Sequence, residues 1–536
     1  MGLTGRSFAK FIHVKYLTFQ PVLSKATSQK KSKENLKQHA YLNSITAMID
    51  HVGVQLTGFI VNPFIVSGLG SAFYGIWQML TQMTGYANMA DTRATQVLKW
   101  SVSKKRNVSS DEELRSEVTT ALVITAIIVP IVLIIGSVIV WYAPNLIQAG
   151  EQYKNIIRIT CSLLILTLVV HKIFDLFESV LRGMNLGFKR MGVRAGIIAF
   201  GGLLKVLAIT LGYGLIGLAF VQILIALFLG MTFYYIVKKH VPWFGFGKTN
   251  KEKIKSYGKL SGWFMGFMAT KMMLMNSDKI VLGYLIGPIF VTKYTLTLFT
   301  SFAIKGIVSA ISTGIIPGIG GIFGKGDFQK VQKARNVLIT LNWILVSAFG
   351  VSILLFNQSF IGLWVGAEHY AGNLENLLIM IIAIQYIFFQ MDSDIINITL
   401  KLEIKVLLSF LAASITILLA FLLINEWGIA GLCISIIIGR LLLSIGYPLV
   451  LKKRINDSKF IFSPKSIRPI ITTLVILCIA SYLGRWILID NWFYLVSIGA
   501  ISLPIGGLVV WFLGINQSER SEVTQIVSKI KFFKTH

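Results

Sequence analysis

The sequence predicts an all-α integral membrane protein with about 14 transmembrane helices, formed by two parallel six-helix bundles and two extra C-terminal helices. Three observations support this prediction: a hydrophobic composition, a regular alternation of basic and uncharged loops, and an internal repeat. Hydrophobic residues make up 54% of the chain and charged residues only 14%, and the mean hydropathy is +0.71. These values lie far outside the range of soluble domains.

Apolar runs long enough to cross a hydrocarbon core of about 30 Å recur along most of the chain. Only short Gly-containing turns separate the fifth predicted span from the sixth and the eleventh from the twelfth. The predicted spans are 41–64, 72–97, 117–143, 155–179, 191–212, 214–237, 257–286, 288–322, 336–357, 373–400, 404–425, 428–451, 466–488 and 491–514.

The basic residues alternate along the chain from one side of the membrane to the other. About 40 of the 51 Lys and Arg residues lie in the N-terminal arm, the tail and alternate loops such as 104–106, 238–259 and 452–465. The intervening loops, such as 144–154 and 358–372, hold only about three. By the positive-inside rule both termini face the cytoplasm. Because topology explains the net charge of +28, we expect no nucleic-acid partner.

An internal repeat relates two stretches about 214 residues apart. Residues 214–219 (GLIGLA) recur as 428–433 (GIAGLC), and each copy ends in a pair of lysines, at 233–239 (FYYIVKK) and 447–453 (YPLVLKK). Six predicted spans separate the copies, an even number, so both halves enter the membrane in the same direction. Parallel repeats of this kind pack about an axis along the membrane normal and leave a cavity between them.

Domain boundaries follow from the spans and the repeat. We call the first repeat the N-lobe and the second the C-lobe. The predicted divisions are a basic cytoplasmic arm (1–40), the N-lobe with spans 1–6 (41–240), a cytoplasmic linker (241–256), the C-lobe with spans 7–12 (257–454), spans 13 and 14 (466–514) and a cytoplasmic tail (515–536).

The sequence carries no signature of an enzyme or of a metal site. Residues 247–249 (GKT) resemble the end of a phosphate-binding P-loop, but Pro242 stands where that loop needs glycine. The three cysteines lie in predicted spans without CxxC or His partners, and no HExxH or GxSxG pattern occurs. We therefore expect a transporter rather than an enzyme, with no cofactor and no metal. A membrane-embedded glycosyltransferase or polymerase is the enzyme alternative, but such enzymes usually have a sizeable loop or soluble domain.

Charged residues inside the predicted spans are the candidate functional residues. An ionised side chain at mid-helix costs at least about 2.5 to 3.5 kcal/mol unless it faces water or a partner. The C-lobe spans hold about five cations against three acids, which favours a substrate with an anionic headgroup such as a pyrophosphate. The candidate substrate-binding residues are Arg93, Lys271, Lys279, Lys293 and Lys305, and the candidates for coupling to H+ or Na+ are Asp50 and Asp278.

Structural ion pairs are the alternative interpretation for several of these charges. His171 and Asp175 are four residues apart and can pair on one helix face. Glu178 and Arg182 lie near a cytoplasmic end, where a solvated pair is expected. Arg440 could equally be the structural partner of an acid in its bundle. Lys293 and Lys305 have no such neighbour on their own helix.

Several short motifs resemble a known family. They are residues 69–77 (LGSAFYGIW), Gly85 and Tyr86 followed by Asp91, residues 277–283 (SDKIVLG) with Tyr294, Pro317, and residues 326–327. In this order they resemble the polysaccharide transporter branch of the multidrug/oligosaccharidyl-lipid/polysaccharide exporter (MOP) superfamily, which includes the O-antigen repeat-unit flippases. The resemblance covers about residues 41–515. Where that family has a glycine-containing turn after the acid, this chain has Thr92 and Arg93, a departure that bears on whether span 2 bends.

The resemblance implies a function and a location. It implies alternating access between two six-helix lobes in the bacterial inner membrane and the flipping of an undecaprenyl-pyrophosphate-linked oligosaccharide during surface polysaccharide biosynthesis. The implied partners are this lipid-linked oligosaccharide, membrane lipids, polysaccharide polymerase and glycosyltransferases, with the protein acting as a monomer. In related lipid II flippases the two extra spans form a groove for the lipid tail. Two alternatives from the same superfamily are a cation-coupled multidrug antiporter and a lipid II flippase.

Overall fold

The computed structural model describes residues 26–90, 93–106, 109–324, 326–399, 403–455 and 464–532, and these ranges contain helices and no strand. The first 25 residues of the predicted basic arm, and Asp91 of the family motif, lie outside them. The helices are α2 (Ala26–Tyr86), α3 (Ala94–Lys105), α4 (Asp111–Leu146), α5 (Lys154–Gly183), α6 (Phe188–Thr210), α7 (Gly214–His240), α8 (Lys251–Ile286), α9 (Pro288–Gly324), α10 (Phe328–Trp364), α11 (Asn373–Ile398), α12 (Glu403–Ile455), α13 (Pro464–Leu483), α14 (Trp492–Val509) and α15 (Gln517–Phe532), with short turns η2 (Ala87–Ala90), η3 (Glu151–Tyr153), η4 (Ala367–His369) and η5 (Val510–Gly514).

Two of the helices each contain two predicted spans. Helix α2 breaks at Gly70 (φ 74°, ψ 163°) and helix α12 at Gly428 (φ 54°, ψ −131°). When α2 and α12 are counted as two spans each, and α4 to α11, α13 and α14 as one span each, the total is the predicted 14. In the described ranges, nine continuous helical segments are long and apolar enough to cross a membrane. The all-α membrane fold is therefore confirmed, and the protein is a multi-pass membrane protein.

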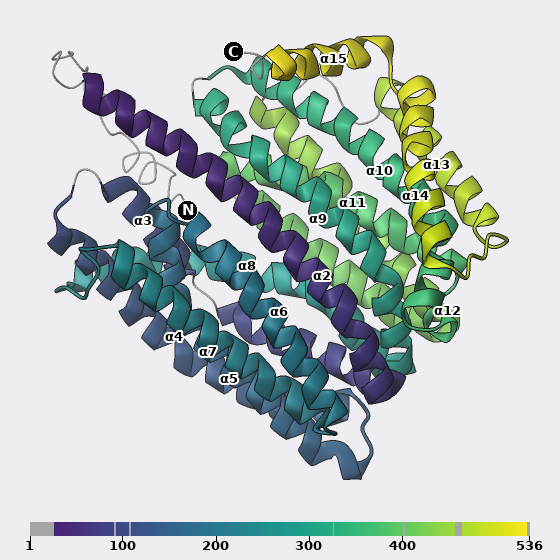
Figure 1. Ribbon diagram of the computed structural model, residues 1–536, viewed down its shortest axis with the longest axis horizontal. Helices are drawn as coiled ribbons and strands as arrows, with labels where there is room; N and C mark the ends of the chain where they lie inside the picture. The colour runs from purple at the N-terminus through teal and green to yellow at the C-terminus, as the bar shows by residue number, and fades with distance from the viewer. Residues whose placement is uncertain are drawn as a thin grey trace, which may run out of the picture.

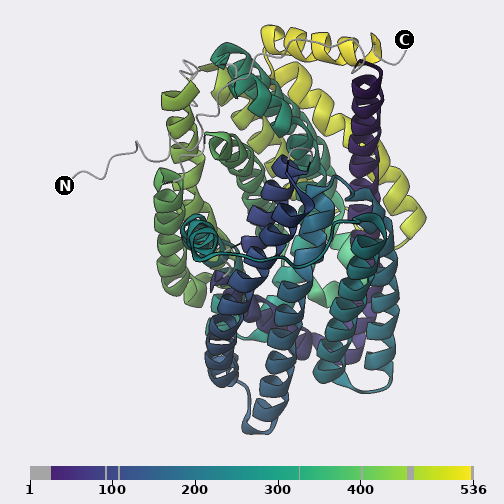
Figure 2. The ribbon, with the colours of Figure 1, turned by 90° about the vertical axis from the view of Figure 1, so that its left-hand side faces the viewer.

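The helices of each repeat pack mainly with one another. Helices α4, α5, α6 and α7 lie on one side of the molecule with the first half of α2, and α9, α10, α11 and α12 lie on the other (Figure 1). Helix α8 contacts both groups, because it packs against α12 as well as against α2 and α4. Helices α13 and α14 pack against α10 at the far edge, and α15 lies across one end of the bundle (Figure 2).

The apolar clusters differ between the predicted outer and cytoplasmic ends of the helices. The largest cluster surrounds the turns at the predicted outer ends of the helices and takes residues from both lobes, such as Tyr74, Leu282, Tyr294 and Ile436. Toward the predicted cytoplasmic end one cluster surrounds Leu98 of the N-lobe and includes Tyr257 at the start of α8, and other clusters lie in the C-lobe. The largest apolar core shared by the two lobes therefore lies at the outer end.

Hydrogen bonds strengthen this outer junction. The Thr292 hydroxyl on α9 donates to the carbonyl oxygen of Ser71 at 2.6 Å, and the Trp364 indole on α10 donates to the carbonyl oxygen of Phe59 at 2.7 Å. Gly75 of α2 meets the start of α9 so closely that a Cβ on it would lie 1.9 Å from the Pro288 carbonyl oxygen. Only glycine allows the two backbones to approach to this distance.

The end of the second span differs from the prediction. The predicted span 72–97 is wrong at its C-terminal end, because α2 stops at Tyr86 and a separate helix, α3, begins at Ala94. Arg93 caps this helix in the left-handed conformation (φ 50°, ψ 37°). Non-glycine residues uncommonly adopt the left-handed conformation. A hydropathy average reports composition and not backbone conformation, so it could not reveal the break between α2 and α3.

We expect Gly75→Ala to weaken the outer junction. The added Cβ would force the α2 and α9 backbones apart, and overpacking of this kind typically costs about 1 to 3 kcal/mol. The thermal unfolding midpoint of the purified protein should fall by several degrees. The control is Gly196→Ala on α6, where nothing lies within 4 Å of the new Cβ. Equal midpoints for the two variants would contradict this description of the junction.

Candidate functional site

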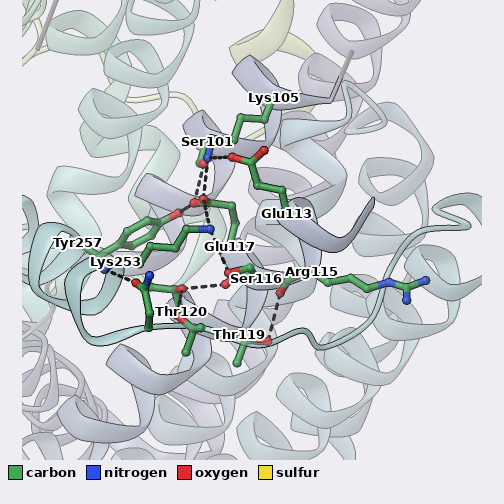
Figure 3. Close-up of polar contacts among 12 residues, drawn as sticks. Ser101, Lys105, Glu113, Arg115, Ser116, Glu117, Thr119, Thr120, Lys253 and Tyr257 are labelled. Carbon is green, nitrogen blue, oxygen red and sulfur yellow. Dashed lines mark hydrogen bonds and ion pairs between the residues drawn. The ribbon is translucent and has the colours of Figure 1, made fainter. Parts of the chain in front are cut away.

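Helix α8 carries three of the seven candidate residues, and a buried carboxylate fixes its cytoplasmic end to the N-lobe. Glu117 of α4 is 3% exposed and accepts hydrogen bonds from Ser101 at 2.7 Å, from Lys105 at 2.9 Å and from the Tyr257 hydroxyl of α8 (Figure 3). Lys253, also on α8, donates to the Ser116 hydroxyl at 3.0 Å. The start of α8 is thus held by α3 and α4, whereas its outer half packs against α12 of the C-lobe.

Lys105 neutralises this cluster from outside the membrane spans. Burial disfavours its charge, but hydrogen bonds from its ammonium group to Glu113 and Glu117 outweigh burial, so the pKa of Lys105 is raised above its ordinary value. Lys105 therefore stays charged and compensates the Glu117 carboxylate, which is a condition for burying that carboxylate.

Asp278 lies at the centre of a polar group in the C-lobe. Its Oδ2 accepts a hydrogen bond from the Tyr294 hydroxyl of α9 at 3.1 Å, and its Oδ1 accepts one from the backbone N–H of Lys279 at 2.9 Å. Arg440 of α12 interacts electrostatically with both Asp278 and Tyr294. Three helices therefore contribute to one group, in which a carboxylate and a guanidinium are neighbours without a direct ion pair.

Arg440 is the most buried cation of this group. It is 7% exposed, its Nη2 donates to the Leu274 carbonyl oxygen at 3.2 Å, and its guanidinium carbon lies 5.9 Å from the centre of the Phe389 ring. Its buried Nε has no hydrogen-bond partner within the described part of the chain. A guanidinium presents five donors, so much of its capacity to bind an anion is unused here.

Lys305 adds a second cation beside Arg440. Its ammonium lies 3.4 Å from the centre of the Tyr386 ring and 4.2 Å from that of Phe302. Its electrostatic neighbours include Arg440 and Asp278, and it forms no ion pair with the residues that the structure describes. Aromatic faces replace an acidic partner only in part, so the Lys305 amino group is available to an anionic ligand.

Lys271 and Arg93 are electrostatic neighbours at the edge of this group. Lys271 is exposed on α8, and its electrostatic neighbours are Arg93 at the start of α3 and Asp394 on α11. It also interacts electrostatically with Lys305. Four candidates, Lys271, Lys305, Asp278 and, at the edge, Arg93, are therefore linked in one polar group with Arg440, which we call the C-lobe group.

Lys279 and Lys293 lie outside the C-lobe group. The Lys279 ammonium donates to the Gln78 side-chain oxygen of α2 at 2.9 Å, next to a second contact between the lobes, from the Tyr86 hydroxyl to Ser277 at 2.6 Å. Lys279 thus helps to join α8 to α2. Lys293 lies in the second turn of α9, near the outer end, and pairs with no acid among the described residues.

Asp50 lies in the N-lobe and has a partner that sequence reasoning missed. One carboxylate oxygen pairs with the Arg194 guanidinium of α6, and the other oxygen, although buried, has no hydrogen-bond partner in the described ranges. The Nε2 atom of the adjacent His51 is also buried and unpartnered there, and it lies against Gly306 of α9. Asp50 and His51 thus lie where α2 meets both α6 and the C-lobe.

Other buried charges form structural pairs. Arg335 and Asp392 form two hydrogen bonds of 2.8 and 2.9 Å between α10 and α11, and Glu178 pairs with Arg190 at 3.1 Å. Sequence reasoning placed Arg440 among the structural candidates, and it did not consider Arg194 or Tyr386 at all. No short-range pattern marks these residues, because their neighbours come from distant helices. Tyr294 alone was marked, through the family motif.

Solved structures with the same arrangement of helices are transporters and flippases of the MOP superfamily. The lipid II flippase MurJ in an inward closed conformation superposes with a TM-score of 0.63 at 12% identity, covering 88% of this chain and 99% of that chain. An inward-facing multidrug resistance MATE family transporter of the MOP superfamily gives a TM-score of 0.57 at 15% identity, covering 78% and 94%. A MOP superfamily transporter from Pyrococcus furiosus Vc1, described by a reverse polarity of its binding pocket, gives 0.53 at 15% identity, covering 78% and 96%.

These similarities define the class of fold. The chain has the fold of MOP superfamily transporters. Identities of 12% to 15% establish that fold and do not extend to a substrate. No protein-family model matches the sequence, and no curated protein sequence matches it either.

We expect Glu117→Ala to detach the start of α8 from the N-lobe. Losing a buried carboxylate that accepts hydrogen bonds from a charged and two neutral donors should cost about 2 to 3 kcal/mol. The thermal midpoint should fall, and protease cleavage in the linker between α7 and α8 should become faster. Glu112→Ala, which removes an exposed carboxylate one turn earlier on α4, is the control and should change neither measurement.

Proposed function

We propose that the protein is a flippase that moves an undecaprenyl-pyrophosphate-linked oligosaccharide repeat unit from the cytoplasmic to the outer leaflet by alternating access, for biosynthesis of a surface polysaccharide such as O-antigen. The proposal places the protein in the bacterial inner membrane, as a monomer with both termini in the cytoplasm. Its partners in the pathway are glycosyltransferases that make the substrate and a polymerase that uses it.

The observation that carries this proposal is the excess of positive charge in the C-lobe group. Lys305 and Arg440 are close enough to interact electrostatically, yet neither has a direct carboxylate partner in the described residues. Two cations held near each other inside a membrane repel unless an anion lies between them. A pyrophosphate carries that charge, and a guanidinium can bind two of its oxygens at once.

The position of the group suits alternating access. Its Tyr294 belongs to the outer core that joins the lobes, and Arg440 contacts Leu274 and Phe389 of a C-lobe cluster. A substrate headgroup entering from the cytoplasm would reach Lys271 and Arg93 before Arg440. This order would bring the headgroup progressively under the outer junction.

The fold comparisons supply weaker support. The lipid II flippase covers 88% of the chain and the MATE transporter 78%, and the difference is about the size of the α13 to α14 hairpin. The description of the Pyrococcus furiosus protein indicates that pocket polarity varies within the fold. A cationic lining in this chain is compatible with that variation.

Lipid II flipping is the second candidate function. The larger coverage by the lipid II flippase favours it, and lipid II carries the same pyrophosphate. A multidrug antiporter is less favoured, because a cationic drug would meet Lys305 and Arg440. Rescue of cells depleted of their own lipid II flippase would separate the two flippase functions.

Asp50 is the proposed coupling residue. Among the described residues, its Oδ1 and the Nε2 of the next residue, His51, are buried without a hydrogen-bond partner. His51 lies against Gly306 of α9, so the two residues are at a contact between the lobes. Binding of a proton or Na+ there would change the charge that balances Arg194. Asp278 is less suited to this role, because both of its oxygens already accept hydrogen bonds.

We expect loss of either cation of the C-lobe group to impair flipping. Lys305→Gln and Arg440→Gln should each lower the transport of a pyrophosphate-linked lipid in proteoliposomes by about tenfold or more, as expected for a charge-assisted contact. Arg440→Lys, which keeps the charge, should retain part of the activity. Lys293→Gln removes a cation from the same α9 helix outside the group and is the control. Full surface polysaccharide in cells with both Gln variants at normal membrane levels would refute the proposal.

We expect Asp50→Asn to uncouple transport. The variant removes the ionisable oxygen but keeps a hydrogen-bond acceptor for Arg194, so the protein should still fold. Substrate-driven downhill flipping should continue, whereas its dependence on a proton or Na+ gradient should disappear. Flipping by the variant with an unchanged response to both gradients would exclude Asp50 as the coupling residue.

A further inference from the structure

A cavity of about 520 Å³ opens at the predicted cytoplasmic end of the C-lobe, away from the C-lobe group. The cavity is lined by residues at the C-terminal ends of α9 and α11 and at both ends of α12. Cavities that bind small molecules in proteins usually measure about 300 to 1,000 Å³, so this one can admit a ligand group.

One part of the lining is basic and polar. Lys453 and Arg454, from the last turn of α12, line the cavity together with Thr399 at the end of α11, and the Arg454 guanidinium lies 3.4 Å from the Thr399 hydroxyl. No carboxylate lines the cavity in the described part of the chain, and the exposed Glu403 is a neighbour of the lining residue Ile404. This part of the cavity suits an anion.

The remaining lining is apolar. Leu449 and Val450 lie one turn before the basic pair on α12, and Ile404 and Phe323 complete the lining. Leu449 is 39% and Ile404 49% exposed, so the apolar part opens toward the membrane. A cavity with basic groups at the membrane surface and apolar groups just below it matches the two parts of a phospholipid.

The internal repeat provides a comparison within the same chain. In the N-lobe, Lys239 is the repeat equivalent of Lys453, and His240 stands where the C-lobe has Arg454. Lys238 and Lys239 lie over the rings of Tyr234 and Tyr235, each 5.9 Å from a ring centre. Neither of them lines the 520 Å³ cavity. Helix-end charge is therefore common to both lobes, whereas this cavity lies at the end of the C-lobe.

We propose that this cavity binds the phosphate headgroup of an anionic phospholipid from the cytoplasmic leaflet, with Lys453, Arg454 and Thr399 contacting the phosphate and Leu449 and Ile404 contacting the first part of the acyl chains. The cytoplasmic leaflet is the anionic one, and Lys and Arg residues at its surface each contribute to lipid attraction. The bound lipid holds the ends of α11 and α12 together. This site is independent of the proposed flippase substrate.

The test measures lipid binding to the purified full-length protein by native mass spectrometry and by thermal unfolding. Phosphatidylglycerol should bind and raise the unfolding midpoint by several degrees. The double variant Lys453→Gln/Arg454→Gln should bind it at least tenfold more weakly, whereas the matched variant Lys238→Gln/Lys239→Gln should bind it as the native protein does. The charge-conserving variant Lys453→Arg/Arg454→Lys should retain binding, which separates loss of charge from loss of folding.

Three outcomes would overturn the proposal. An equal stabilisation by phosphatidylcholine would indicate lipid that coats the protein without using the site. An equal effect of inorganic phosphate alone would indicate a site for a free anion. An equal loss of binding in the Lys453→Gln/Arg454→Gln and Lys238→Gln/Lys239→Gln variants would show that helix-end charge, rather than the cavity, attracts the lipid.

Discussion

The close contact between Gly75 and Pro288 determines how the two lobes are joined. Two helices from different repeats approach there to a distance that leaves no room for a side chain, and the shared apolar core and the hydrogen bonds from Thr292 and Trp364 surround that point. The largest core shared by the lobes surrounds this contact, whereas the cytoplasmic side is joined through the start of α8.

The two lobes share a scaffold but differ in charge. In the C-lobe, Lys305 interacts electrostatically with Arg440 and Asp278, whereas in the N-lobe Asp50 pairs with Arg194. Both lobes also keep ion pairs near the cytoplasmic end: the buried Arg335 pairs with Asp392, and the half-buried Glu178 pairs with both Arg190 and Arg182. The duplication therefore explains the fold and the structural pairs, and the differences between the copies provide the candidate site.

The sequence alone was sufficient to predict the fold, because hydropathy, loop charge and the repeat can each be read along the chain without knowing which distant residues are in contact. It reproduced the 14 spans, including the breaks at Gly70 and Gly428, although it placed the end of the second span near 97 instead of Tyr86. It was less informative about the site. Whether Lys279 faces a ligand or Gln78, and whether Asp50 has Arg194 as a partner, depends on contacts between residues that lie 144 or more positions apart.

Helix α8 is attached to both lobes. Glu117 holds its first turns on the N-lobe through Tyr257, and, further along, the helix packs on α12 of the C-lobe, while Lys279 also joins it to α2. Because α8 is attached to both lobes, a rotation of one lobe against the other would bend this helix. The free energy of any rocking motion would thus be stored partly as curvature in α8, and the distance between Lys271 and Lys305 would change with that curvature.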